Sequence, residues 1–251
     1  MSHSTKPAVR GAAPEGARDP RAASAAVRQM FSSIAPRYDL LNHLLSFNVD
    51  RLWWRRTARA FASTLARSDA RVLDLCCGTG DMAFALLRQA GKATPLIVGA
   101  DFAHPMLQRA RQKSQGRPLS WIEADALRLP VADASLDLVT AAFGFRNLAD
   151  YDAGLREIAR LLRSGGEVGI LDFGKPRGLL GLAYRIYFRR VLPKIGTVIS
   201  GVKGPYQYLP ASVERFPAPQ EMLQRMRAAG LREASWTPYT FGIAGLYRAR
   251  K

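Results

Sequence analysis

A glycine-rich turn flanked by acidic residues is the feature of the sequence that most directly indicates chemistry. Gly78 and Gly80 follow the apolar run 72–75, so we expect a strand to enter the turn and a helix to leave it. Glycines let the backbone approach a ligand closely, and the free N–H groups at a helix start bind anionic groups. Asp101 ends the next predicted strand, about 20 residues downstream, where a carboxylate reaches ribose hydroxyls. The spacing therefore predicts a nucleoside site.

Acidic residues around this turn indicate which kind of nucleoside the site would bind. Asp125 and Ala126 follow the third predicted strand, so the site would lie at the carboxyl ends of three strands, where open α/β sheets bind ligands. Asp74 and Asp81 add negative charge, which suits a ligand with a positive centre better than a pyrophosphate. S-adenosylmethionine carries such a centre in its sulfonium. Both residues could equally be ordinary carboxylates at a strand end and a helix start.

Strand and helix patterns alternate from residue 71 to residue 173, which predicts a mainly parallel sheet covered on both faces. The predicted strands are 71–75, 95–101, 120–123, 136–142 and 167–173. The predicted helices are 81–89, 105–113 and 152–162, the last ended by Gly165 and Gly166. A later helix near 220–229 precedes two strands, 232–238 and 242–249, that would form an antiparallel edge.

The remaining segments define the domain organisation. Residues 1–25 lack helical periodicity and are predicted to be a disordered tail. Residues 26–251 are predicted to form a single domain. Helices within 26–68 and an insertion at about 177–216, which interrupts the strand and helix alternation, would cover the substrate.

Composition excludes several classes of protein. The 251 residues include 37 Lys and Arg against 20 Asp and Glu, a net charge of +17, and 48% are hydrophobic, which excludes a fibrous repeat or wholesale disorder. No apolar run approaches the roughly 20 residues of a membrane span. The two adjacent cysteines, Cys76 and Cys77, provide no disulfide framework and favour a reducing cytosol. The positive charge favours polyanions without choosing between nucleic acid, anionic membrane and acidic proteins.

Further motifs resemble one enzyme family. They are Tyr38-Asp39, Asn42, Ser46, Trp53, Phe143-Gly144-Phe145-Arg146-Asn147, Tyr208-Leu209-Pro210, Ser212-Val213, Phe216-Pro217 and Gly245-Leu246-Tyr247-Arg248. With the glycine turn, they make residues 27–251 similar to class I S-adenosylmethionine-dependent methyltransferases, most closely the family that C-methylates the quinol ring in menaquinone and ubiquinone biosynthesis. The resemblance implies a Rossmann-like, doubly wound, mostly parallel seven-stranded sheet with an antiparallel C-terminal edge.

The resemblance also implies roles for single residues. Thr79 and the backbone of Gly78 and Gly80 would contact the methionine part of S-adenosylmethionine, the methyl donor. Asp101 would hold the ribose hydroxyls. Asp125 and the backbone of Ala126 would meet the adenine. No metal is implied, and the three histidines show no ligand spacing.

Methyl transfer to a hydroquinone needs stabilisation of a phenolate and alignment with the sulfonium methyl. Arg146 follows the fourth strand beside the cofactor site, so we expect it to stabilise the phenolate. Tyr38 and His43 are further candidates for handling protons. Arg146 could equally be a structural arginine paired with a helix carboxylate.

The expected acceptor is demethylmenaquinol, a polyprenylated hydroquinone whose tail lies in a bilayer. The insertion interleaves apolar residues with arginines, which favours transient contact with an anionic membrane surface by a cytoplasmic protein. A homodimer is compatible with the sequence. The alternatives are the equivalent step in ubiquinone biosynthesis, RNA methylation and a non-catalytic binding protein; no specific nucleic acid is expected.

Overall fold

The computed structural model describes residues 11, 12, 14, 16–35, 39, 46, 48–176, 181, 187 and 205–251. Its helices are α1 (Pro20–Ile34), α3 (Val49–Arg59), α4 (Ala62–Leu65), α5 (Asp81–Ala90), α6 (His104–Lys113), α7 (Tyr151–Leu161), α10 (Pro205–Arg215) and α11 (Pro219–Ala228), with short 3-10 turns η2 (Phe145–Asn147) and η4 (Thr240–Gly242). Its strands are β1 (Arg71–Leu75), β2 (Leu96–Asp101), β3 (Leu119–Glu123), β4 (Leu136–Ala142), β5 (Leu162–Phe173), β6 (Arg232–Tyr239) and β7 (Ala244–Arg250).

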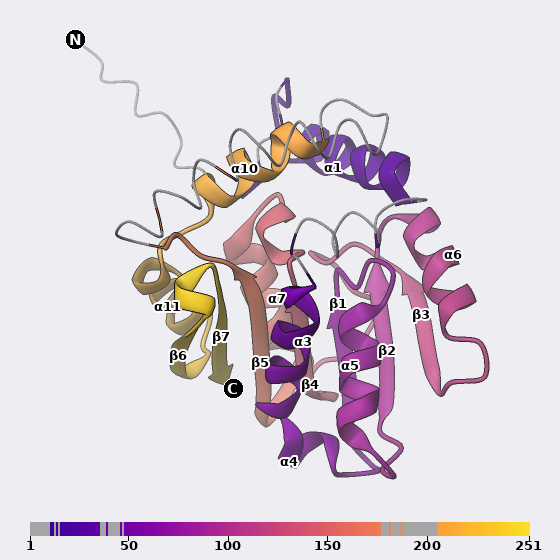
Figure 1. Cartoon of the computed structure of the whole chain (residues 1–251). Helices are drawn as coiled ribbons and strands as arrows, with labels where there is room; N and C mark the ends of the chain where they lie inside the picture. The colour runs from indigo at the N-terminus through magenta and orange to yellow at the C-terminus, as the bar shows by residue number, and fades with distance from the viewer. Residues whose placement is uncertain are drawn as a thin grey trace.

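The strands form one seven-stranded sheet in the order β3-β2-β1-β4-β5-β7-β6 (Figure 1). Strands β1 to β5 are parallel to their neighbours, whereas β7 runs antiparallel to both β5 and β6. The order steps outward from β1 in both directions, so a topological switch point lies between β1 and β4, where doubly wound sheets bind ligands. The predicted sheet, including its antiparallel edge, is confirmed.

The central strands are apolar on both faces because helices cover both. Val72 packs on one face with α3, α4 and α5, whereas its neighbour Leu73 packs on the other with α7 and α11. Leu138 and Val139 of β4 divide in the same way. Alternation along each strand therefore builds two separate cores, which hold the carboxyl ends of the parallel strands at one fixed edge.

Two predicted boundaries were wrong. Gly165 and Gly166 do not end a helix, because α7 already ends at Leu161 and both glycines lie within β5. The backbone of both is hydrogen-bonded to Lys251, so these residues extend the sheet. Residues 20–25, predicted as part of the tail, belong to α1, because the Asp19 side chain accepts a hydrogen bond from the Ala22 N–H and caps the helix.

Helices α1 and α10 lie against each other across the carboxyl edge of the parallel strands (Figure 1). Of the segments predicted to cover the substrate, α1 and α10 lie at this edge, whereas α3 and α4 pack with α5 on one face of the sheet. Apart from Gly181, Tyr187 and residues 205–216, the predicted insertion lies outside the described residues. In the part of the chain that the structure describes, no helix is long and apolar enough to cross a membrane.

Candidate active site

The turn between β1 and α5 has the left-handed backbone that its glycines allow. Gly78 and Gly80 have φ values of +54° and +91°. A Cβ on Gly80 would lie 2.3 Å from the ring of Trp121, so this glycine also makes room for protein packing. Gly78 lines the pocket at the strand ends, whereas Gly80 and Thr79 are not among its lining residues.

Asp101 fastens the end of β2 to this turn. Its Oδ2 accepts a hydrogen bond from the Gly78 N–H at 2.9 Å, and its Oδ1 accepts one from the Ala103 N–H at 2.9 Å. The side chain is buried and lines the pocket, and burial raises its pKa while the backbone donors oppose the rise. Each oxygen keeps a lone pair for a further donor. The carboxylate is therefore held ready to accept hydrogen bonds from a ligand's hydroxyls.

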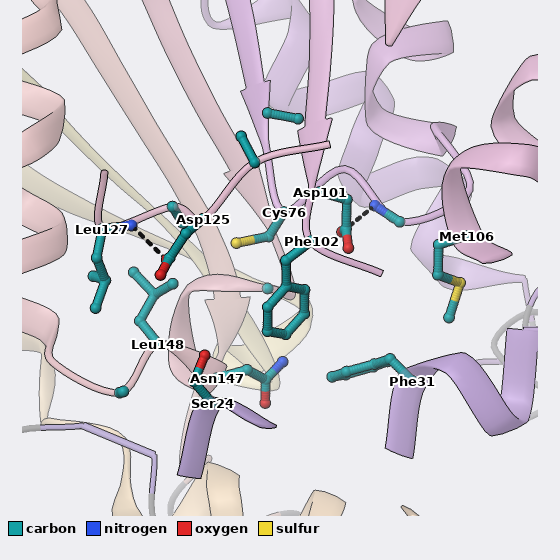
Figure 2. A pocket seen from close by; sticks show the side chains of 16 residues that line it. Ser24, Phe31, Cys76, Asp101, Phe102, Met106, Asp125, Leu127, Asn147 and Leu148 are labelled. Atoms are coloured by element: carbon teal, nitrogen blue, oxygen red, sulfur yellow. Dashed lines mark hydrogen bonds between the residues drawn. The ribbon is translucent and has the colours of Figure 1, made fainter. Parts of the chain in front are cut away.

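The loop after β3 forms a second wall of the pocket. Asp125 Oδ1 accepts a hydrogen bond from the Leu127 N–H at 2.9 Å, which stabilises the turn that carries Ala126. Phe102 and Met106 line the pocket from the β2 side (Figure 2). An apolar slot with one carboxylate at its edge suits a flat heterocycle with an exocyclic donor.

The pocket also has a wall to which α1, a helix outside the quoted motifs, contributes. Ser24 and Phe31 of α1 line it, together with Asn147 at the end of η2 (Figure 2). Arg28 of α1 forms an ion pair with Glu123 of β3 at 2.6 Å, which ties this helix to the sheet. The apolar stripe of α1 was visible in the sequence, but nothing in that stripe indicated that the helix faces a ligand.

Thr79 does not face the pocket. Its hydroxyl is buried and donates to Asp39 Oδ1 at 2.5 Å. Lys113 of α6 contacts Asp39 at 3.0 Å and Asp81 at 2.7 Å. Asp81 is thus paired with a lysine. Asp74 is buried under the turn, where it accepts a hydrogen bond from Thr140 at 2.8 Å, so both acids have ordinary structural partners.

Arg146 is buried and ion-paired. Its Nη1 lies 3.0 Å from Oδ1 of Asp172 and also donates to the Phe143 carbonyl, while its backbone N–H donates to the other carboxylate oxygen at 3.2 Å. The guanidinium lies over the ring of Phe173, 5.1 Å from its centre. Burial raises the pKa of Asp172 although Arg146 opposes the rise. The structural alternative had expected a helix carboxylate, but the partner is on strand β5.

The remaining candidate residues are those for proton transfer, metal binding and thiol chemistry. Tyr38 and His43 lie outside the described residues. Among the residues that the structure describes, no group of three or more His, Cys, Asp or Glu side chains has the arrangement of a metal site. Burial raises the pKa of both Cys76 and Cys77, so both are neutral thiols at neutral pH.

Solved structures resemble this fold at low sequence identity. The [4+2]-cyclase SpnF aligns with a TM-score of 0.67 and 18% identity, covering 96% of this chain and 98% of that one. An S-adenosylmethionine-dependent methyltransferase of Aquifex aeolicus aligns with a TM-score of 0.56 and 17% identity, covering 77% of this chain and 88% of that one. At such identity, these matches support the fold class alone.

Sequence relatives are much closer. A demethylmenaquinone methyltransferase of Deinococcus radiodurans is 53% identical over 225 residues, covering 88% of this chain and 91% of that protein. One of Thermus thermophilus is 52% identical over 221 residues, covering 87% and 98%. A ubiquinone/menaquinone biosynthesis C-methyltransferase of Geobacter sulfurreducens is 42% identical over 230 residues, covering 90% and 88%. The ubiE/COQ5 methyltransferase family matches residues 19–251. By this match and these identities, the chain belongs to the ubiE/COQ5 methyltransferase family.

Proposed function

We propose that the protein transfers the methyl group of S-adenosylmethionine to a ring carbon of demethylmenaquinol, which gives menaquinol. The observation that carries this proposal is the 53% identity to a demethylmenaquinone methyltransferase over 88% of the chain. The pocket at the strand ends supports this proposal. It places the Asp101 carboxylate where a ribose would lie, followed by an apolar slot and the Asp125 carboxylate for the base of a nucleoside.

The pocket fits S-adenosylmethionine on one further point. Asn147 Oδ1 is buried at the pocket wall and has no hydrogen-bond partner among the described residues. A buried acceptor without a partner is unfavourable until a donor reaches it, and the cofactor's ammonium group is such a donor. When bound, the cofactor supplies an electrophilic methyl group on a sulfonium.

Individual roles in cofactor binding follow from this fit. Asp101 accepts hydrogen bonds from the ribose hydroxyls, and Asp125 with the Ala126 backbone holds the adenine. Gly78 lets its backbone approach the methionine part. Gly80 and Thr79 act on the same part through the shape of the turn, because Thr79 is bound to Asp39 and Gly80 packs on Trp121.

Arg146 supplies the positive charge beside the acceptor. It lies in η2, which follows β4, and it precedes Asn147 of the pocket wall; Arg146 itself is not among the residues that line the pocket. A guanidinium held by Asp172 keeps its orientation and stabilises a phenolate without moving, which is how preorganised charge accelerates a reaction. Tyr38 is a second candidate catalytic residue, and we propose that it transfers a proton to or from the acceptor.

We also propose that the protein acts in the cytoplasm, at the surface of the cytoplasmic membrane. A groove between α3 and α5 is lined by Arg51, Arg55, Arg59 and Arg88, beside the exposed Leu52. Among the described residues, none of the four arginines has a carboxylate partner. Free guanidinium groups beside an exposed apolar side chain complement anionic lipid headgroups.

Three alternatives compete with this proposal. The relative from Geobacter sulfurreducens is named for both quinone pathways, so the ubiquinone precursor is the nearest rival acceptor. RNA methylation is favoured only by the net charge of +17. A non-catalytic binding protein would bind the cofactor without turnover.

The deciding experiment combines the purified full chain with isotopically labelled S-adenosylmethionine and chemically reduced demethylmenaquinone. Mass spectrometry should find a quinone heavier by one labelled methyl group. Parallel reactions contain the ubiquinone precursor or bulk RNA. A preference for either acceptor, or cofactor binding without transfer to any of the three, would overturn the assignment.

A further inference from the structure

Helix α10 brings a tyrosine hydroxyl to the corner where Arg146 and Asp172 meet. The hydroxyl of Tyr208 is buried and has no hydrogen-bond partner among the described residues. The charges of Arg146, Arg215 and Asp172 all act on its pKa, so it lies close to these groups. Helix α10 also packs directly on η2, the turn that carries Arg146.

A second donor in the same corner has no partner either. Arg146 uses Nη1 for Asp172 and the Phe143 carbonyl, but its buried Nε donates to nothing in the described part of the chain. Folded proteins leave few buried polar groups unsatisfied, and two unsatisfied donors on neighbouring elements indicate a site for a ligand that offers oxygen.

A neighbouring tyrosine shows what a structural hydroxyl looks like in this corner. Tyr151 is fully buried, and its hydroxyl donates to the Arg146 carbonyl at 3.0 Å. Its ring packs between those of Phe145 and Phe216. The fold therefore uses the hydroxyl of Tyr151 and leaves that of Tyr208 unused, although both lie beside Arg146.

We propose that the Tyr208 hydroxyl donates a hydrogen bond to a ring oxygen of the hydroquinone acceptor and so positions the ring for methyl transfer. This inference rests on the proposed function and adds the residue that holds the acceptor. Nε of Arg146 also has no hydrogen-bond partner in the described part of the chain. It contributes positive charge to the same ring oxygen.

The hydroxyl acts as a donor and keeps its proton throughout the reaction. Burial raises the pKa of Tyr208, so the phenol stays neutral and is a poor base. During transfer, a ring-carbon electron pair forms the new bond to the methyl group and the sulfonium sulfur leaves as a thioether with the bonding pair. The displaced ring proton passes to water. The hydrogen bond from Tyr208 stabilises the negative oxygen from which this electron density comes.

The test is Tyr208→Phe, which removes only the oxygen. Because that oxygen has no hydrogen-bond partner in the described part of the chain, the melting temperature should stay equal or rise, and affinity for S-adenosylmethionine should not change. The kcat for demethylmenaquinol should fall about tenfold, as expected for loss of one hydrogen bond to a charged oxygen. The matched control is Tyr151→Phe, which should lower the melting temperature and leave kcat per folded molecule nearly unchanged.

Binding of menadiol, a hydroquinone without a prenyl tail, provides a second readout that does not depend on turnover. Calorimetry in the presence of S-adenosylhomocysteine should give a weaker affinity for Tyr208→Phe than for the unaltered chain. Equal kcat and equal menadiol affinity in the two proteins would overturn this proposal. A fall in melting temperature with unchanged kcat would also overturn it, because the role would then be structural. Failure of the unaltered chain to methylate any quinol would instead count against the proposed function.

Discussion

The cofactor side and the acceptor side of this site are built in opposite ways. On the cofactor side, both oxygens of Asp101 are held by backbone N–H groups, and Asp125 is held by Leu127. On the acceptor side, Arg146 Nε and the Tyr208 hydroxyl are buried without partners in the described part of the chain. The two carboxylates are held in place before any ligand arrives, whereas the two donors have no partner until a ligand supplies one. Under the proposed function, the carboxylates that hold the cofactor are a preformed cradle, whereas the donors that hold the acceptor gain their partner only when it binds.

The largest effect is expected at the cofactor cradle. Asp101→Ala removes the acceptor of two backbone hydrogen bonds and the partner of the ribose, so affinity for S-adenosylmethionine should fall at least about 100-fold. Isothermal calorimetry measures this change. Asp101→Asn, which keeps one carbonyl oxygen, should lose less. If Asp101→Ala bound the cofactor normally, the cradle would not depend on this carboxylate.

Variants of the Arg146–Asp172 pair should show whether Arg146 serves the stability of the fold or the methyl transfer. Arg146→Met alone leaves a buried carboxylate unpaired, so the free energy of unfolding should fall by about 3 kcal/mol. Arg146→Met combined with Asp172→Leu should recover most of that loss, because neither buried charge remains. Denaturant unfolding and the methylation assay are compared on both variants. Turnover should stay low in the double variant; full turnover there would show that the arginine serves the fold alone.

The arginine groove between α3 and α5 is expected to bind the membrane surface. Arg55→Gln with Arg59→Gln should weaken binding to vesicles containing phosphatidylglycerol about 30-fold, because each basic residue near an anionic bilayer contributes about 1 kcal/mol. Co-sedimentation at low and high salt measures this loss. Arg71→Gln with Arg232→Gln removes the same charge elsewhere and should bind like the unaltered chain. Equal losses in both pairs would mean that net charge, rather than the groove, drives binding.

The smallest effect is expected beneath the cofactor turn. Burial raises the pKa of Asp74 to about 7, so between about pH 4 and pH 7 the folded chain keeps a proton that the unfolded chain releases. The stability contributed by this group therefore falls as the pH rises through that range. Asp74→Asn should flatten this fall and raise the melting temperature by a few degrees at pH 8. Asp69→Asn is the control, because an arginine partner lowers the pKa of that exposed carboxyl. Identical pH profiles for unaltered chain and Asp74→Asn would refute the assignment.

Much of the cofactor side could be predicted from the sequence because its signals are local. A strand followed by glycines, and acids at later strand ends, place Gly78, Asp101 and Asp125 in one pocket once a parallel sheet is inferred. The same rule would have found Asp172, which lies one residue before the end of β5, the parallel neighbour of β4. That carboxylate was overlooked as the partner of Arg146.

Other parts of the site depend on contacts between distant segments. Lys113 reaches Asp39 across 74 positions of sequence, and no periodicity indicates that contact. Phe31 was assigned to an apolar helix stripe, which is equally compatible with packing on a core or covering a ligand. The contacts of these residues depend on how α1 and α6 pack against the rest of the protein. The sequence of one segment does not specify which neighbour that segment packs against.

The position of β7 has a consequence for how the chain folds during synthesis. Strand β5 finds its antiparallel neighbour only after about 70 further residues, since Phe173 pairs with Ala244, and β6 reaches the sheet only through β7. Until β7 is made, β5 presents an open hydrogen-bonding edge of largely apolar residues. Open edges of this kind recruit other chains. A ribosome that stalls before Ala244 would therefore release an aggregation-prone product with the complete cofactor turn, which makes the last strand the step that protects the nascent chain.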